Sequence, residues 1–202
     1  MPELKRLGFL ASGRGSNMLA IISACESGRL PATPVLVISN NPDARALQLG
    51  REHGLEALHM SSRTHGDDGA LDQAMTAAMQ AHQVDLVILA GYMKKIGPQL
   101  LSAYAHHILN IHPSLLPRHG GRGMYGLHVH EAVISAGETE TGVTVHLVNT
   151  EYDSGDILAQ RTVNVEANDD AESLAARVLE VEHRLYTEVL GKILNGEISL
   201  PE

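Results

Sequence analysis

The sequence is poor in cysteine and in aromatic residues. Among 202 residues it has one cysteine, Cys25, no tryptophan, one phenylalanine and five tyrosines. A single cysteine forms no disulfide within the chain, which fits a reducing compartment. So few aromatic side chains leave little for stacking the bases of single-stranded nucleic acid. Both shortages favour a cytoplasmic protein that acts on small molecules.

Positive charge and long apolar runs are also scarce. The chain carries 24 acidic and 15 basic residues, which gives a net charge of −9. A field of that sign disfavours nucleic acid and anionic membranes as partners. No stretch approaches the roughly 20 apolar residues that cross a membrane, and the N-terminal MPELKRLGFLAS shows no secretory signal. We expect neither nucleic acid nor membrane as a partner, whereas monomer and homodimer both remain open.

Short apolar runs do occur, and in the first half of the chain they alternate with helical patterns. Strands are expected at 7–11, 35–38, 57–60 and 84–89, and helices at about 18–27, 43–54 and 68–82. Nearly continuous apolar strands that alternate with helices are typical of a parallel sheet covered on both faces. The pattern predicts an α/β fold with a Rossmann-like, doubly wound sheet.

The second half has a different order. Its expected elements are a strand at 108–112, a glycine-rich loop at 117–126, a helix at 130–136, strands at 142–148 and 157–165, and a helix at 170–194. The last helix is predicted by apolar residues at helical spacing. The two later strands are expected to be antiparallel. Because no repeat or linker interrupts the pattern, we expect a single domain over 1–202.

The loop after the first strand, Gly13-Arg14-Gly15-Ser16-Asn17, is the first candidate site. It precedes a helix, whose free N-terminal amides form a natural phosphate site. A tight turn capped by Ser16 or Asn17 explains the same residues, and the two interpretations are compatible. The loop lacks the P-loop lysine, and Met18 replaces the third glycine of a dinucleotide fingerprint.

Asn110 and His112 form the second candidate, since alternate residues of a strand share one face. A carboxamide beside a titratable imidazole offers an oxyanion a hydrogen bond and a proton, although these residues alone favour a hydrogen-bonded histidine that caps the strand. Thr144 and His146 similarly share a face of a later strand, and Asp153 lies in the turn beyond it. A carboxylate near His112 favours the imidazolium, but the sequence does not show that the two meet.

Histidine is abundant, with twelve in the chain, so a metal-dependent hydrolase is an alternative class. The nearest cluster is His128-Val129-His130, which lacks a glutamate at the helical spacing of metalloproteases. We therefore expect no metal.

Several segments, in this order, resemble the folate-dependent phosphoribosylglycinamide formyltransferases of purine biosynthesis. The matching runs are 12–17 (SGRGSN), 89–93 (LAGYM), 109–117 (LNIHPSLLP), 142–146 (GVTVH) and 153–155 (DSG). The resemblance extends from about Leu7 to Leu190 and implies the formyltransferase fold. It also implies 10-formyltetrahydrofolate as co-substrate and glycinamide ribonucleotide as acceptor, joined through a tetrahedral intermediate.

The resemblance further implies roles for individual residues. Asn110, His112 and Asp153 would be catalytic, with Thr144 and His146 supporting them by orienting His112 or Asp153. The ribonucleotide would contact Gly15, Ser16, Asn17, Gly91, Met93 and Glu182, and the folate would contact Met93, Lys94, Lys95, Ile96, Asn110 and Asp153.

Two features depart from the family pattern. The loop at 118–126 is longer and richer in glycine, and no basic residue within 61–69 securely matches the one that relatives use near the folate tail. A formyltetrahydrofolate hydrolase, or a formyltransferase acting on another amine, is the nearest alternative function.

Overall fold

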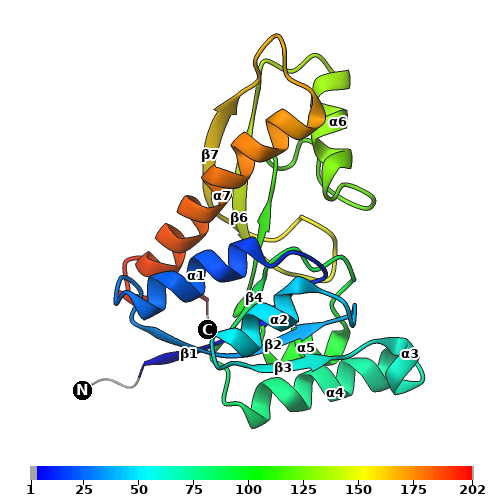
Figure 1. Ribbon diagram of the computed structural model, residues 1–202, viewed down its shortest axis with the longest axis vertical. Coiled ribbons are helices and arrows are strands. Elements are labelled where there is room, and N and C mark those ends of the chain that lie inside the picture. Colours follow the sequence, from blue (N-terminus) through cyan, green and yellow to red (C-terminus); the bar gives the residue numbers. More distant parts are fainter. Residues whose placement is uncertain (1–3, 202) are drawn as a thin grey trace.

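Residues 4–201 of the chain are described by this computed structural model, and they build one sheet with helices on both faces (Figure 1). The strands are β1 (Lys5–Leu10), β2 (Ala32–Ser39), β3 (Glu56–His59), β4 (Leu86–Leu89), β5 (Ile108–His112), β6 (Glu140–Leu147) and β7 (Ile157–Asn164). The helices are α1 (Ser16–Glu26), α2 (Arg45–Glu52), α3 (Ser62–His65), α4 (Asp68–Ala81), α5 (Pro98–Ala103), α6 (Leu127–Ser135) and α7 (Ala171–Leu194).

The strand order is β3-β2-β1-β4-β5-β6-β7. β1 to β5 run parallel to one another, whereas β6 runs antiparallel to both β5 and β7. This arrangement confirms the predicted doubly wound sheet and its antiparallel extension. The two short helices α3 and α5 were not expected from the sequence.

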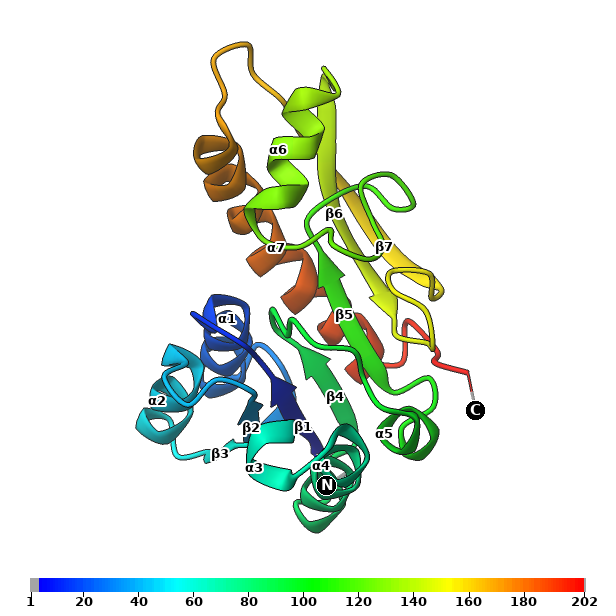
Figure 2. The ribbon, with the colours of Figure 1, turned by 90° about the vertical axis from the view of Figure 1, so that its right-hand side faces the viewer.

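Alternate residues along the strands pack into two separate hydrophobic cores, one on each face of the sheet. Leu7 and Phe9 of β1 pack with α1, α2 and α7 on one face of the sheet. Leu10 of the same strand packs with α4 and α5 on the other face. Figure 2 shows α1 and α2 on the side of the sheet away from α4 and α5. The rule that apolar strands indicate two covered faces therefore holds here.

The strand order reverses between β1 and β4, and in such sheets ligands bind at the carboxyl ends of the strands at this point. Ser12 joins the loops there. Its hydroxyl donates to Asn40 Oδ1 at 2.5 Å and accepts from the Met93 amide at 2.8 Å. The loops after β1, β2 and β4 are thus held together at the edge where a substrate would lie.

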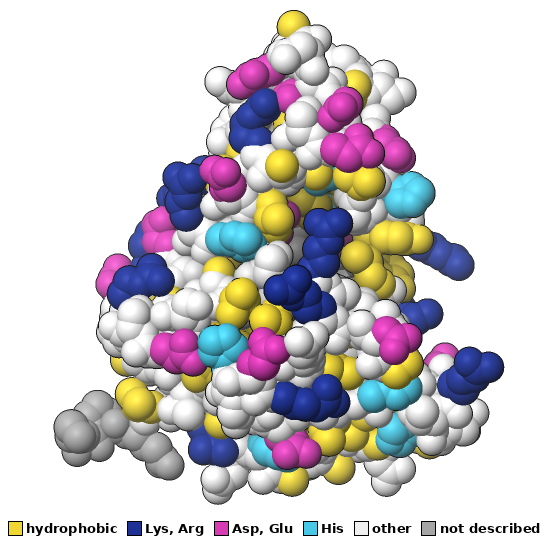
Figure 3. Space-filling model, in the orientation of Figure 1, with side chains coloured by type: hydrophobic (Ala, Val, Ile, Leu, Met, Phe, Trp, Pro, Cys, Tyr) yellow, Lys and Arg dark blue, Asp and Glu magenta, His cyan; other side chains and the backbone are white. Residues whose placement is uncertain are grey.

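Within residues 4–201 no helix is long and apolar enough to cross a membrane. On the face shown in Figure 3, acidic and basic side chains are interspersed over the surface rather than gathered into one large area of single sign.

Candidate active site

The end of β5 carries two of the predicted catalytic side chains. Asn110 lies opposite His146 of β6, and His112 lies opposite Thr144. Because β5 and β6 are paired in register, all four side chains point to one face, as alternation along each strand predicts. His112, Thr144 and His146 are buried, and Asn110 is half-buried.

Asp153 reaches this cluster from the loop between β6 and β7. Its Oδ2 lies 3.6 Å from His112 Nδ1, and its Oδ1 lies 3.7 Å from His146 Nε2. The residue has a φ of 53°, a left-handed conformation that turns the loop back over the strands. The structure therefore brings together Asp153 and His112, which the sequence left unconnected.

His146 fixes the orientation of the Asn110 carboxamide. Its Nδ1 lies 2.8 Å from the Leu147 carbonyl oxygen, and its Nε2 lies 3.0 Å from Asn110 Nδ2. Burial lowers the pKa of His146, which favours the neutral ring. With Nδ1–H donating to the carbonyl, the neutral Nε2 accepts from the amide of Asn110. One N–H of Asn110 is used in this way, and the second is left for a substrate.

Thr144 acts elsewhere than expected. Its hydroxyl donates to the Ser114 carbonyl at 2.7 Å, and it accepts from the Leu116 amide at 3.1 Å and from Gln160 Nε2 at 2.9 Å. These bonds hold the chain that follows His112. The expectation that Thr144 orients the imidazole or carboxylate itself is therefore replaced by a role in fixing the adjacent loop.

The glycine-rich loop contacts both catalytic side chains through its backbone. His112 Nε2 lies 2.8 Å from the His119 carbonyl oxygen, and the Gly121 amide donates to Asp153 Oδ2 at 2.8 Å. Both ring nitrogens of His112 thus face acceptors, an arrangement that the protonated ring satisfies. Sequence analysis missed these contacts because a backbone carbonyl or amide leaves no residue-type signal.

The loop after β1 presents the N-terminus of α1. Gly15 is the N-cap, with a φ of 72°, where Ser16 or Asn17 was expected. A Cβ atom on Gly15 would lie 2.9 Å from the Ala46 side chain, so glycine is needed for both backbone conformation and space. The first amides of a helix have no intrahelical acceptor and attract anions. The geometry suits a phosphate group.

Glu182 is buried, unlike an ordinary glutamate on a helix surface. It lies on α7, and its Oε2 accepts a hydrogen bond from Asn17 Nδ2 of α1 at 2.6 Å. Burial raises the pKa of Glu182 to about 7, although the bond from Asn17 acts in the opposite direction. Asn17 Oδ1 is buried, and residues 4–201 contain no hydrogen-bond partner for it. The Asn17 side-chain oxygen of this pair is therefore available to accept a hydrogen bond from a ligand beside the N-terminus of α1.

The loop after β4 exposes most of its predicted binding residues. Gly91, Met93, Lys94 and Lys95 are exposed, and Met93 retains 47% of its accessible surface. The side chain of Ile96 instead packs in the core between the sheet, α4 and α5, so only its backbone is available to a ligand.

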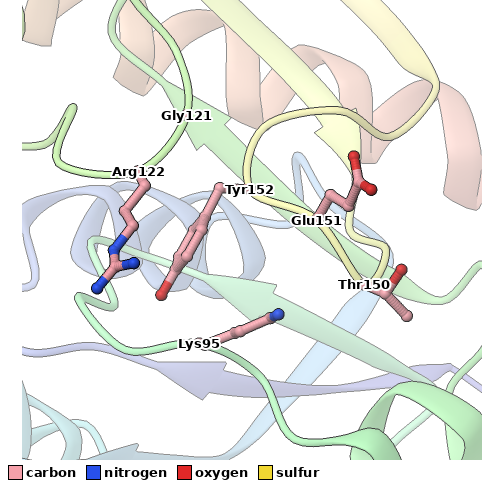
Figure 4. A pocket seen from close by; sticks show the side chains of 6 residues that line it. All are labelled: Lys95, Gly121, Arg122, Thr150, Glu151 and Tyr152. Atoms are coloured by element: carbon pink, nitrogen blue, oxygen red, sulfur yellow. The ribbon is translucent and has the colours of Figure 1, made fainter.

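A cavity of about 570 Å³ (Figure 4) is lined in part by Gly121, whose amide donates to Asp153. Its lining consists of Lys95, Gly121, Arg122, Thr150, Glu151 and Tyr152. Lys95 Nζ lies 6.0 Å from the centre of the Tyr152 ring, at the limit of a cation–π contact. An aromatic wall with two cationic side chains suits a flat ligand that carries negative charge.

Among residues 4–201, no three His, Cys, Asp or Glu side chains are gathered so that they could hold a metal ion. His128, from the cluster considered above, lies instead on the surface, with its Nδ1 3.8 Å from Glu131. The metal-hydrolase alternative therefore has no candidate ligand set in this part of the chain.

Comparison with known proteins gives consistent results. The family model described as "Formyl transferase" matches residues 5–190. The chloroplastic phosphoribosylglycinamide formyltransferase of Arabidopsis thaliana is 42% identical over all of this chain and 69% of its own length. The Haemophilus influenzae phosphoribosylglycinamide formyltransferase is 37% identical over 98% of this chain and 92% of its own. The crystal structure of glycinamide ribonucleotide transformylase 1 from Symbiobacterium toebii superimposes on this chain with a TM-score of 0.93 at 38% identity. The match covers 100% of this chain and 92% of that one.

Proposed function

The chain belongs to the formyl transferase family, and we propose that Asn110, His112 and Asp153 are the residues that carry its reaction. It is an enzyme of purine biosynthesis that transfers a formyl group to the amine of 5-phosphoribosylglycinamide. The donor that we propose is 10-formyltetrahydrofolate. The observation that supports these residues most strongly is the approach of Asp153 Oδ2 to within 3.6 Å of His112 Nδ1, beside Asn110.

The ribonucleotide phosphate is proposed to bind the amides of Gly15, Ser16 and Asn17 at the start of α1. The positive end of the helix and the unpaired amides both favour an anion there. Glu182 contacts Asn17 and would accept hydrogen bonds from the ribose hydroxyls. Gly91 and Met93, in the neighbouring loop, would then line the glycinamide end on its way to the catalytic cluster.

The folate is proposed to enter through the cavity next to Asp153. Met93, Lys94 and Lys95 line this approach, together with the backbone of Ile96. The aromatic and cationic lining fits a molecule with flat rings and carboxylates. Its reacting end would meet Asn110 and Asp153. No contact between 61–69 and the folate tail is included, because no basic residue of this segment, Arg63 included, securely matches the family pattern.

The three residues divide the chemistry as follows. When the amine attacks the formyl carbon, a C–N bond forms and the formyl oxygen gains negative charge in a tetrahedral intermediate. The free N–H of Asn110 donates to that oxygen, and protonated His112 stabilises its charge. Loss of one such donor typically lowers the rate roughly 10²–10³-fold.

Asp153 is the residue that takes part in proton transfer from the attacking amine. It takes the proton that the attacking amine sheds, directly or through water, and relays a proton to His112, whose Nδ1 lies 3.6 Å from its Oδ2. His112 helps to deliver a proton to the folate nitrogen as the bond to the formyl carbon breaks. The oxygen then re-forms its double bond, and the products are the formylated ribonucleotide and tetrahydrofolate. No covalent enzyme intermediate and no metal enter this scheme.

We further propose that the whole chain works as one formyltransferase domain with small molecules as its partners. Two related functions remain as competitors. A hydrolase would use water in place of the amine, and another transferase would use a different amine. The phosphate site at α1 favours the ribonucleotide, because neither water nor a simple amine needs it.

The test follows the formyl carbon itself. The donor is prepared with ¹³C in the formyl group and mixed with enzyme and ribonucleotide, and NMR follows the labelled carbon. We expect the signal to move to an amide of the ribonucleotide with the wild-type protein and to remain on the donor with Asn110→Ala. Appearance of the label as free formate would instead indicate a hydrolase.

A further inference from the structure

The glycine-rich loop at 118–126 has no part in the chemistry above, yet the catalytic groups depend on its position. The His119 carbonyl is the acceptor 2.8 Å from His112 Nε2, and the Gly121 amide is the donor 2.8 Å from Asp153 Oδ2. A shift of this segment would therefore move the imidazole and the carboxylate together. What holds the loop in place is then part of the catalytic arrangement.

The path of the loop at His119 is conformationally demanding. His119 has a φ of 52°, which a residue with a side chain adopts only where its surroundings enforce it. At the next residue, Gly120, a Cβ atom would lie 2.4 Å from Leu116 Cδ2. The loop therefore runs close against the chain beneath it. The peptide that faces His112 needs external contacts to keep this conformation.

Ser114 Oγ donates to the Arg118 carbonyl at 2.7 Å from beneath the loop, and Glu138 supplies contacts to its side chains from outside the cavity. Glu138 lies in the turn between α6 and β6, and its amide donates to the Val133 carbonyl at the end of α6. Its Oε2 lies 3.0 Å from Arg118 Nη1, and its Oε1 lies 3.2 Å from His119 Nε2. One carboxylate thus holds the two residues that lead into the His119 carbonyl.

We propose that Glu138 is a positioning residue for formyl transfer. By holding Arg118 and His119 it keeps the His119 carbonyl against His112 Nε2, and so sets the angle at which the imidazole faces Asp153. The inference rests on the proposed function. Glu138 acts through Arg118 and His119 and is not among the residues that line the cavity.

The distinguishing consequence is a loss of rate without a matching loss of binding or stability. Arg118 is more than half exposed, and exposed ion pairs contribute little to folding stability. Small displacements of catalytic groups, in contrast, lower rates strongly. An ordinary surface ion pair would leave both the rate and the state of His112 unchanged.

The experiment compares Glu138→Ala and Glu138→Gln with the matched control Glu131→Gln. Glu131 is an exposed glutamate of the neighbouring α6, and its Oε2 lies 3.8 Å from His128 Nδ1. We expect Glu138→Ala to lower kcat at least about tenfold, with ribonucleotide KM and Tm close to those of the control. Glutamine keeps an acceptor for one of the two donors, so its kcat should lie between those of alanine and wild type.

A second measurement does not depend on turnover. With ¹⁵N-labelled histidine, the Nε2 signal of His112 should show a protected N–H in wild type and faster exchange in Glu138→Ala. Unchanged His112 signals together with a kcat within about twofold of wild type would overturn the proposal. So would a fall in ribonucleotide binding as large as the fall in kcat. A wild-type protein without transfer activity would refute the proposed function, while the NMR comparison would still test the positioning.

Discussion

Glu182→Gln should make the stability of this protein less dependent on pH. The carboxyl group of Glu182 is buried between α7 and α1, with Asn17 as its hydrogen-bond partner. Burial raises its pKa from the ordinary value of 4.5 to about 7. Glutamine has nearly the shape of the protonated glutamic acid and stays neutral at every pH. The variant therefore removes the titration while keeping an oxygen that accepts from Asn17.

The stability of the wild-type protein is expected to fall as the pH rises, because folding is linked to proton binding at Glu182. Below pH 4.5, Glu182 is protonated in the folded and the unfolded chain, and its burial causes no ionisation penalty. As the pH rises toward 7, the unfolded chain ionises while the folded one remains protonated, so the folded state loses stability. Above about pH 7 both are ionised and the loss levels off. The pKa of Glu182 is about 7 in the folded chain and 4.5 in the unfolded chain. This difference corresponds to a loss of about 3 kcal/mol in the free energy of unfolding.

The assay is urea unfolding of wild type and Glu182→Gln, followed by circular dichroism, at several values between pH 4 and pH 8.5. The free energies of unfolding should nearly coincide at the acid end. At the alkaline end the glutamine variant should be the more stable by about 3 kcal/mol. Parallel curves across the whole range would refute the reasoning, because they would mean that Glu182 ionises in the folded protein as easily as in the unfolded one.

Three further substitutions test the site. His112→Ala should abolish measurable transfer while ribonucleotide binding, measured by calorimetry, and the circular dichroism spectrum persist; near-normal turnover would contradict the mechanism. Asp153→Asn should lose activity with little change in ribonucleotide affinity, whereas an equal loss of affinity would make Asp153 a structural residue. Gly15→Ala should destabilise the protein by about 1–3 kcal/mol in urea unfolding, since its Cβ would meet Ala46. Gly13→Ala, where no atom lies within 4 Å of the added Cβ, is the control and should change little.

Most of the fold follows from local pattern. The strand at 108–112 and the helix that ends at Leu194 are found where the apolar spacing predicts them. The short helix α5 was missed because its start depends on a distant residue. Its first amides, at Gln99 and Leu100, donate to the buried Asp72 carboxylate of α4. A cap supplied from 27 residues away leaves no local signal.

The candidate site was predictable in its residue types more than in its geometry. Strand alternation correctly placed Asn110 beside His112 on one face. The approach of Asp153 required the loop between β6 and β7 to fold back, which local spacing does not reveal. Burial of Glu182 likewise depends on how α7 packs against α1.

The most direct test of the account is a spectrophotometric assay with 10-formyltetrahydrofolate, run with and without glycinamide ribonucleotide. The account predicts that the donor loses its formyl group only when the ribonucleotide is present. Deformylation in its absence would contradict the account, because it would mean that water is the acceptor. No reaction in either cuvette would contradict it as well, since the donor or the amine would then be a different molecule.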